Sequence, residues 1–139
     1  MKIKKYDIAI TACVMDLLHS GHLELLQLMR KNADNLVMFL HDDFSTFENK
    51  KKFPVQSYNH RERNLLNFVD EIIKVKNKNP QEYFINFLKK NLDKKIVYIR
   101  GDDWKNFPGI NIIKDFNIPI IYKKYTPEIS STILRNNLK

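Results

Sequence analysis

The chain has 139 residues and a mass of 16.6 kDa, which is the size of one folded domain. Hydrophobic residues make up 43% of it and charged residues 29%, so it can bury a core and lacks the composition of a disordered or collagenous chain. Lys and Arg number 24 against 16 Asp and Glu, and the net charge of +8 favours an anionic partner, either nucleic acid or a phosphorylated metabolite. A solvated surface rich in lysine is the alternative explanation of this charge.

Two further features bound the class of protein. No apolar run approaches the roughly 20 residues that cross a bilayer, and Tyr6 and Asp7 interrupt the N-terminal apolar stretch, so we expect a cytoplasmic protein without a membrane span. Cys13 is the single cysteine, which excludes an internal disulfide and a cysteine-based zinc site. We expect Cys13 to pack as a small hydrophobic side chain.

Segments with strand and helix patterns alternate along the chain. The predicted strands, which are apolar and bounded by polar or turn residues, cover residues 6–14, 36–41, 72–75, 95–100 and 118–122. The predicted helices, which show helical apolar spacing or a capping residue, cover residues 23–31, 57–68, 81–91, 111–115 and the segment from about 130. Ser20 and Ser57 are the expected caps of the first two, and residues 44–55 are expected to form a polar loop.

This alternation predicts right-handed βαβ units and therefore an α/β fold. We expect one doubly wound, Rossmann-like domain over residues 1–139, with a five-stranded, mostly parallel sheet. In such sheets ligands bind beyond the carboxyl ends of the strands. The polar motifs that follow predicted strands cover residues 16–22, 42–52, 101–104 and 129–135. Their common position predicts one site built from all four.

The motif D-L-L-H-S-G-H at residues 16–22 resembles the D-x-x-H-x-G-H signature of the cytidylyltransferase branch of the nucleotidyltransferases. Residues 50–61 resemble the lysine loop and following helix of bacterial glycerol-3-phosphate cytidylyltransferases. The segments V-D-E-I, R-G-D-D-W and I-S-S-T, which begin at residues 69, 100 and 129, match in the same order. The resemblance implies transfer of a cytidylyl group from CTP to a small phosphorylated alcohol such as glycerol 3-phosphate, with Mg²⁺ carried on the nucleotide.

Physical chemistry gives the first motif a role without reference to the family. His19 and His22, with Gly21 between them at a helix start, can donate to phosphate oxygens while the helix N-terminus adds amide donors. Lys50 lies in a loop that can close over a triphosphate and neutralise the leaving pyrophosphate. We predict these two histidines and Lys50 as catalytic residues. A structural pair of histidines and a zinc-binding pair are the alternatives.

The remaining site predictions concern the substrates. Hydroxyls and amides at the start of the last helix can hold the β- and γ-phosphates, and carboxylate and indole groups in the G-D-D-W motif can contact the base or the acceptor. The predicted nucleotide-binding residues are Val14, Met15, Asp16, Gly21, Lys52, Asp103, Thr126, Ser130, Ser131 and Thr132. The predicted acceptor-binding residues are Arg61, Trp104 and Arg135. No residue is predicted as a metal ligand.

The sequence departs from the family pattern at three positions. The family usually has Gly where Cys13 stands and Arg where Tyr125 stands, and an Arg late in the third helical segment is replaced by Asn67. An adenylyltransferase, a cytidylyltransferase for another acceptor, a nucleotide-binding relative without activity and a nucleic-acid-binding module therefore stay open as alternatives. Relatives of this size imply a homodimer, for which the apolar candidates are Leu65, Leu66 and Phe68.

Overall fold

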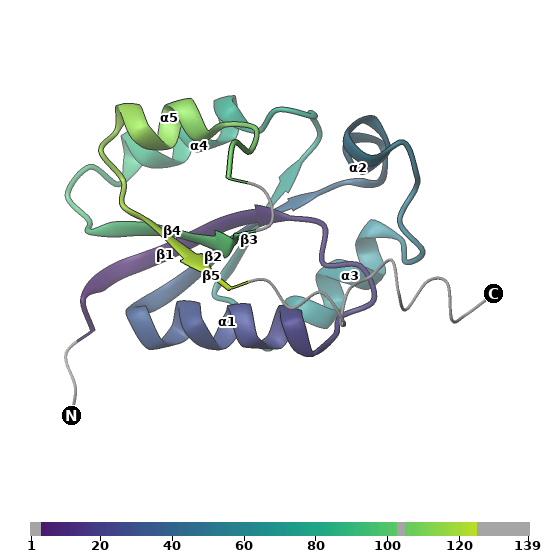
Figure 1. The fold of residues 1–139 in the computed structure, drawn as a ribbon, viewed down its shortest axis with the longest axis horizontal. Coiled ribbons are helices and arrows are strands. Elements are labelled where there is room, and N and C mark those ends of the chain that lie inside the picture. The colour runs from purple at the N-terminus through teal and green to yellow at the C-terminus, as the bar shows by residue number, and fades with distance from the viewer. Residues whose placement is uncertain (1–3, 103–104, 125–139) are drawn as a thin grey trace.

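The computed structural model describes residues 4–102 and 105–124, and its centre is a sheet of five parallel strands (Figure 1). The strands are β1 (Tyr6–Cys13), β2 (Ala33–His41), β3 (Glu71–Val75), β4 (Ile96–Gly101) and β5 (Ile120–Lys123). Their order across the sheet is β3-β2-β1-β4-β5, and every neighbouring pair is parallel. The predicted doubly wound α/β fold is confirmed.

The helices α1 (Ser20–Asn32), α2 (Asp43–Lys50), α3 (Tyr58–Leu65), α4 (Gln81–Lys90) and α5 (Ile110–Asp115) surround this sheet. Figure 1 shows α4 and α5 on one face, α1 and α3 on the opposite face, and α2 beyond the carboxyl end of β2. None of the helices within residues 4–102 and 105–124 is long and apolar enough to cross a membrane. The helix predicted from about residue 130 lies outside the described residues.

Both faces of the sheet are packed against helices, which explains the continuous apolar run of β2. On the side of α4 and α5, the Phe39 ring packs edge-to-face on Phe84 and Phe87, at centroid distances of 4.9 and 5.6 Å. On the side of α1 and α3, Met38 is fully buried in the second core cluster. Cys13 packs against that cluster with its thiol 3.0 Å from the sulfur of Met38, so the expectation of a small hydrophobic side chain is confirmed.

Three boundaries differ from the sequence predictions. The region expected to be a loop contains α2, because the carboxylate of Asp42 caps this helix by accepting from the Ser45 amide at 2.8 Å. The cap of α1 is His19 and not Ser20, since the His19 imidazole takes the place of a capping oxygen. Helix α3 is capped by Ser57 as predicted but ends at Leu65, short of residue 68.

The strand order reverses between β1 and β4, and the carboxyl ends of these two strands are called the switch point here. The ladder between β1 and β4 ends at Ile10 and Tyr98, whereas the ladder between β1 and β2 continues to Cys13. The amide of Ala12 instead donates to the Tyr98 hydroxyl at 3.1 Å. The two strands therefore stop pairing before they end, at the position where open α/β sheets bind their ligands.

Candidate active site

The loop that leaves β1 is held in an unusual backbone conformation. Met15 and Leu17 have φ angles of 54° and 51°, in the left-handed region that residues other than glycine rarely adopt. The carboxylate of Asp16 between them accepts from the amides of Val55 and Gln56, at 2.8 and 2.9 Å. These bonds fix the path of the chain toward α1, so Asp16 positions the loop from which the histidine motif begins.

His19 and His22 lie at the N-terminus of α1 with stacked rings, whose centroids are 3.8 Å apart. Nδ1 of His19 accepts from the Gly21 amide at 3.0 Å, and Nδ1 of His22 accepts from the His19 amide at 3.3 Å. A neutral imidazole carries one proton, and these bonds assign it to Nε2 in both rings. The structure thus brings the two predicted catalytic histidines together as a pair of Nε2–H donors.

The surroundings of the pair keep both rings neutral. Burial lowers the pKa of His22 to about 3, with smaller lowering contributions from His19 and the Lys50 charge and an opposing one from Asp16. Burial also lowers the pKa of His19 below its usual value. At neutral pH the pair therefore offers hydrogen-bond donors without the charge of an imidazolium.

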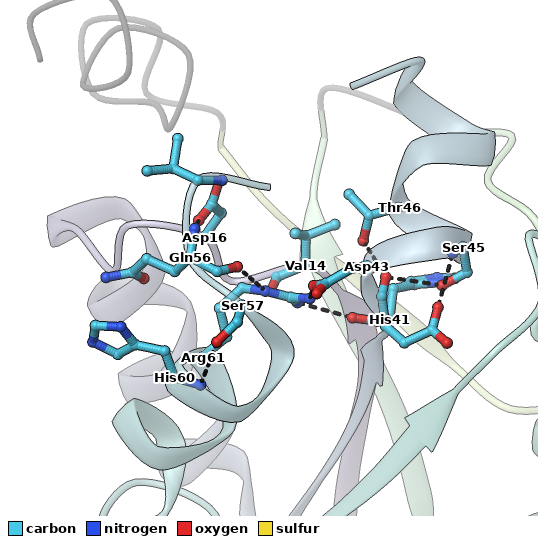
Figure 2. Close-up of polar contacts among 12 residues, drawn as sticks. Val14, Asp16, His41, Asp43, Ser45, Thr46, Gln56, Ser57, His60 and Arg61 are labelled. Carbon is cyan, nitrogen blue, oxygen red and sulfur yellow. Dashed lines mark hydrogen bonds and ion pairs between the residues drawn. The ribbon is translucent and has the colours of Figure 1, made fainter. Parts of the chain in front are cut away.

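Arg61 is the buried polar centre beneath this region (Figure 2). Its side chain is 0% exposed, and its guanidinium donates to the carbonyl oxygens of Val14, His41 and Gln56 at 2.7, 2.8 and 3.1 Å. It also pairs with the Asp43 carboxylate at 2.7 Å. One side chain of α3 thereby joins the ends of β1 and β2 to the start of α2. These partners favour a positioning role, and the contact of Arg61 with the acceptor stays a prediction.

Lys50 is the last residue of α2, and its charge reaches the histidine pair. The positive charge of Lys50 lowers the pKa of His22, and it acts in the same direction on His41 and on the Cys13 thiol. Lys51 follows with φ 61°, in the left-handed conformation that ends the helix, and Lys52 is exposed in the following turn. Of the three lysines, Lys50 is the one that the structure directs toward the site.

An aromatic cluster of Phe44, Phe47 and Phe53 brackets these lysines. Phe47 in α2 stacks on Phe53 beyond the lysines, with centroids 4.6 Å apart and planes at 20°. Phe44 packs edge-to-face on Phe53 at 6.0 Å. The three side chains are 70%, 40% and 53% exposed in chain order, so the cluster lies at the surface. It closes the lysine turn on itself without joining the core.

His41 is a functional-region residue that the sequence did not single out. It ends β2 almost fully buried, and its Nδ1 lies 3.0 Å from Oγ of Ser45, whose hydroxyl donates to the Val75 carbonyl at 3.1 Å. Nδ1 is therefore the protonated nitrogen and donates to Ser45. Burial lowers the pKa of His41 to about 4, so the ring is neutral in the folded protein.

We expect acid to destabilise the fold through this ring. The folded pKa of about 4 lies below the unfolded value of 6.5, so the unfolded chain binds the proton first as the pH falls. The stability that neutral His41 provides is complete above pH 6.5 and is lost toward pH 4, by at most about 1.4 kcal/mol per pH unit. Urea unfolding at stepped pH should show a smaller loss in His41→Asn, which keeps a donor at the Nδ1 position but does not titrate. Parallel losses in the two proteins would exclude His41 as the cause.

The described part of the chain brings together the residues predicted in the first two motifs. Val14, Met15, Asp16 and Gly21 surround the histidine pair in the chain, and Val14 gives its carbonyl oxygen to Arg61. The predicted site residues outside the described ranges are Asp103, Trp104, Thr126, Ser130, Ser131, Thr132 and Arg135. Asp43, which pairs with Arg61, was missed, since no local pattern tells a pairing carboxylate from a solvated one.

Comparisons with known proteins agree with this site. A family model described as Cytidylyltransferase-like matches residues 10–137. The chain is 33% identical over 132 residues to the glycerol-3-phosphate cytidylyltransferase of Bacillus subtilis (strain 168), covering 93% of this chain and 95% of that protein. It is 31% identical over 134 residues to the glycerol-3-phosphate cytidylyltransferase of Staphylococcus aureus (strain NCTC 8325 / PS 47), covering 93% and 92%. The crystal structure of the lipopolysaccharide core biosynthesis protein from Thermoplasma volcanium GSS1 has a TM-score of 0.62 at 25% identity, covering 87% and 99%.

A parallel doubly wound sheet with an H-x-G-H pair at the start of its first helix defines an enzyme of the nucleotidyltransferase class. The matches extend over nearly the whole chain. The chain therefore belongs to the cytidylyltransferase-like family.

Proposed function

We propose that this enzyme transfers the cytidylyl group of CTP to the phosphate of a small phosphorylated alcohol, with glycerol 3-phosphate as acceptor. The observation that carries the proposal is the pair of Nε2–H donors of His19 and His22, with the Lys50 charge in reach, at the switch point. The names of the relatives from Bacillus subtilis and Staphylococcus aureus support the nucleotide and the acceptor. The product is the corresponding CDP-alcohol, here CDP-glycerol.

The reaction is an in-line substitution at the α-phosphorus of CTP. An oxygen of the acceptor phosphate forms a bond to this phosphorus, and the bond to the bridging oxygen of the β-phosphate breaks, so that pyrophosphate leaves. Charge grows on the oxygens around the phosphorus in the transition state, and donors fixed there in advance lower its energy. His19 and His22 supply such donors, and Lys50 meets the charge of the leaving pyrophosphate.

We propose that Mg²⁺ enters with the nucleotide. The described residues contain no group of three or more His, Cys, Asp or Glu that could hold a metal ion. Mg²⁺ prefers oxygen ligands and is commonly bound through substrate phosphates, which fits a triphosphate substrate. The ion would screen the triphosphate charge, and the protein groups that share this task are the Lys50 ammonium and the amides at the start of α1.

Pyrophosphate release with each nucleoside triphosphate and a panel of phosphorylated acceptors tests the proposal. We expect turnover with CTP and glycerol 3-phosphate. A preference for ATP would favour the adenylyltransferase, and a preference for a sugar-alcohol or aminoalcohol phosphate would reassign the acceptor. Binding of CTP without turnover on any acceptor would indicate a relative without activity. Salt-sensitive oligonucleotide binding that CTP does not affect would indicate a nucleic-acid-binding module instead.

Replacing Lys50 with alanine should lower kcat by about 10²-fold, because the charge opposite the leaving pyrophosphate is lost. Steady-state rates with saturating CTP measure this effect. Lys51→Ala is the matched control, since its side chain is exposed and either residue meets the same left-handed backbone. A larger loss in Lys52→Ala than in Lys50→Ala would move the assignment to Lys52.

We also propose a cytoplasmic homodimer. Leu66 and Phe68 follow α3 with 59% and 40% of their surface exposed, while Leu65 is fully buried in the core. Exposed apolar side chains close together are suited to an interface between copies of the chain. Light scattering at micromolar concentration should give twice the monomer mass, and a monomer mass would refute the dimer.

A further inference from the structure

Arg100 near the end of β4 is a charged residue that the reaction described above does not use. It is half-buried, and its guanidinium lies over the Phe107 ring, 4.6 Å from the centroid. Phe107 is itself buried and stacks on Tyr98 with centroids 4.7 Å apart and planes at 9°. The stack of Tyr98, Phe107 and Arg100 therefore fixes the guanidinium at the carboxyl end of β4, on the side of α4 and α5.

The position of Arg100 is the switch point. Its Nε donates to the Gly101 carbonyl oxygen at 3.3 Å, which holds the side chain along the end of the strand. Opposite it, β1 has already stopped pairing with β4 at Ile10 and ends at Cys13. The histidine pair reaches the same place from α1, on the other face of the sheet (Figure 1). Arg100 and the histidines thus flank the switch point from opposite faces.

Positive charges from three elements act on the end of β1. Burial raises the pKa of the Cys13 thiol to about 12, and the charges of Arg100, Lys50 and Arg61 oppose this rise, with Arg100 first among them. Arg61 is completely buried and held by Asp43 and three carbonyl oxygens. Lys50 and Arg100 are the two of these cations that lie nearer the surface. Such a convergence of charge suits a ligand with several negative oxygens.

We propose that Arg100 is a substrate-binding residue that donates hydrogen bonds to a phosphate of the bound substrates at the switch point. This inference rests on the proposed function and deepens it. A guanidinium stacked on an aromatic ring keeps its N–H groups in the ring-parallel plane, where two of them can reach two oxygens of one phosphate. The phosphate belongs either to CTP or to the acceptor, and the two sources are separable by experiment.

The test compares Arg100→Met and Arg100→Lys with the wild-type enzyme. Calorimetry gives the Kd of CTP and of cytidine, and steady-state rates give KM for glycerol 3-phosphate at saturating CTP. Hydrogen bonds to charged groups change affinity by about tenfold to a hundredfold. We expect Arg100→Met to raise either the Kd of CTP or the KM of the acceptor by this factor, while the Kd of cytidine stays within about twofold of wild type. Arg100→Lys should recover part of the loss.

Arg63→Met is the matched control, because it removes one arginine charge from the exposed surface of α3. A rise confined to the Kd of CTP places the triphosphate on Arg100, and a rise confined to the acceptor KM places the acceptor phosphate there. Equal weakening of CTP and cytidine, or changes no larger than those of Arg63→Met, would overturn the inference. A wild-type enzyme that turns over no acceptor would refute the proposed function alone, since the CTP calorimetry would still decide whether Arg100 binds phosphate.

Discussion

His22→Ala is expected to lower kcat by about 10²–10³ while the fold and much of the affinity for CTP are retained. Removal of one donor fixed toward developing charge costs about this factor in other enzymes. The His22 ring qualifies because its Nδ1 is occupied by the His19 amide and its pKa is lowered to about 3, which leaves Nε2–H as a neutral donor. The same reasoning applies to His19, whose Nδ1 accepts from Gly21. Single-turnover rates with CTP and the acceptor measure the effect.

Two substitutions separate catalysis from helix capping at His19. Asn places an acceptor near the position of Nδ1, so His19→Asn keeps the cap of α1 and loses the Nε2 donor. Gln places an amide donor near the position of Nε2, so His19→Gln should retain more turnover than His19→Asn. The cap itself contributes about 0.5–2 kcal/mol of stability, so a purely structural role would rank the two variants by their resistance to urea.

His60 provides the control for these variants, because it is an exposed histidine of α3 (Figure 2). His60→Ala should change kcat by less than about twofold, as surface substitutions usually have small effects. Near-normal turnover in His19→Asn or His22→Ala would contradict the catalytic assignment. The histidines would then have only the structural role of capping α1.

Arg61→Met is expected to lower the free energy of unfolding by about 3–5 kcal/mol. Loss of one partner from a buried ion pair typically costs this much, because the remaining groups stay buried without compensation. Here the carbonyl oxygens of Val14 and His41 lose their guanidinium donor, and the Asp43 carboxylate loses its cation. Urea unfolding followed by circular dichroism measures the change.

The comparison variants are Asp43→Asn and Arg63→Met. Asp43→Asn should cost less than Arg61→Met, because Asp43 is 38% exposed and water can replace part of its pairing. Arg63 is exposed on the same helix, so Arg63→Met should cost less than about 0.5 kcal/mol. A loss below about 1 kcal/mol in Arg61→Met would show that Arg61 does not hold the site together.

The strands were predictable because burial on both faces leaves a clear mark in the sequence. The run that forms β2 is apolar throughout its buried part and ends in Asp42 and Asp43. Helix α2 left no such mark, since Phe44 and Phe47 face the surface and give no apolar stripe toward the core. The cap of α1 was assigned to Ser20 because hydroxyls are common caps, whereas an imidazole accepts in this role here.

The histidine pair was predictable because its motif is local: both rings and their Nδ1 partners lie within a few residues of the helix start. The surroundings of Arg61 were not. Its partners Val14 and His41 are 47 and 20 residues away, on separate strands, and only the sheet topology brings their carbonyl oxygens together. A sequence pattern that shows an arginine on an amphipathic helix cannot distinguish a buried clamp from a ligand contact.

The stack of Phe47 on Phe53 has a thermodynamic consequence for the lysine turn between them. Ordering the backbone of one residue costs on the order of 1–2 kcal/mol at 25 °C in lost conformational entropy. Because the two rings close this segment in the absence of substrate, much of that entropy is lost during folding and not during encounter with the nucleotide. Lys50 then meets the triphosphate with less motion left to freeze, so the unfavourable entropy of binding is smaller than for an open loop of equal length.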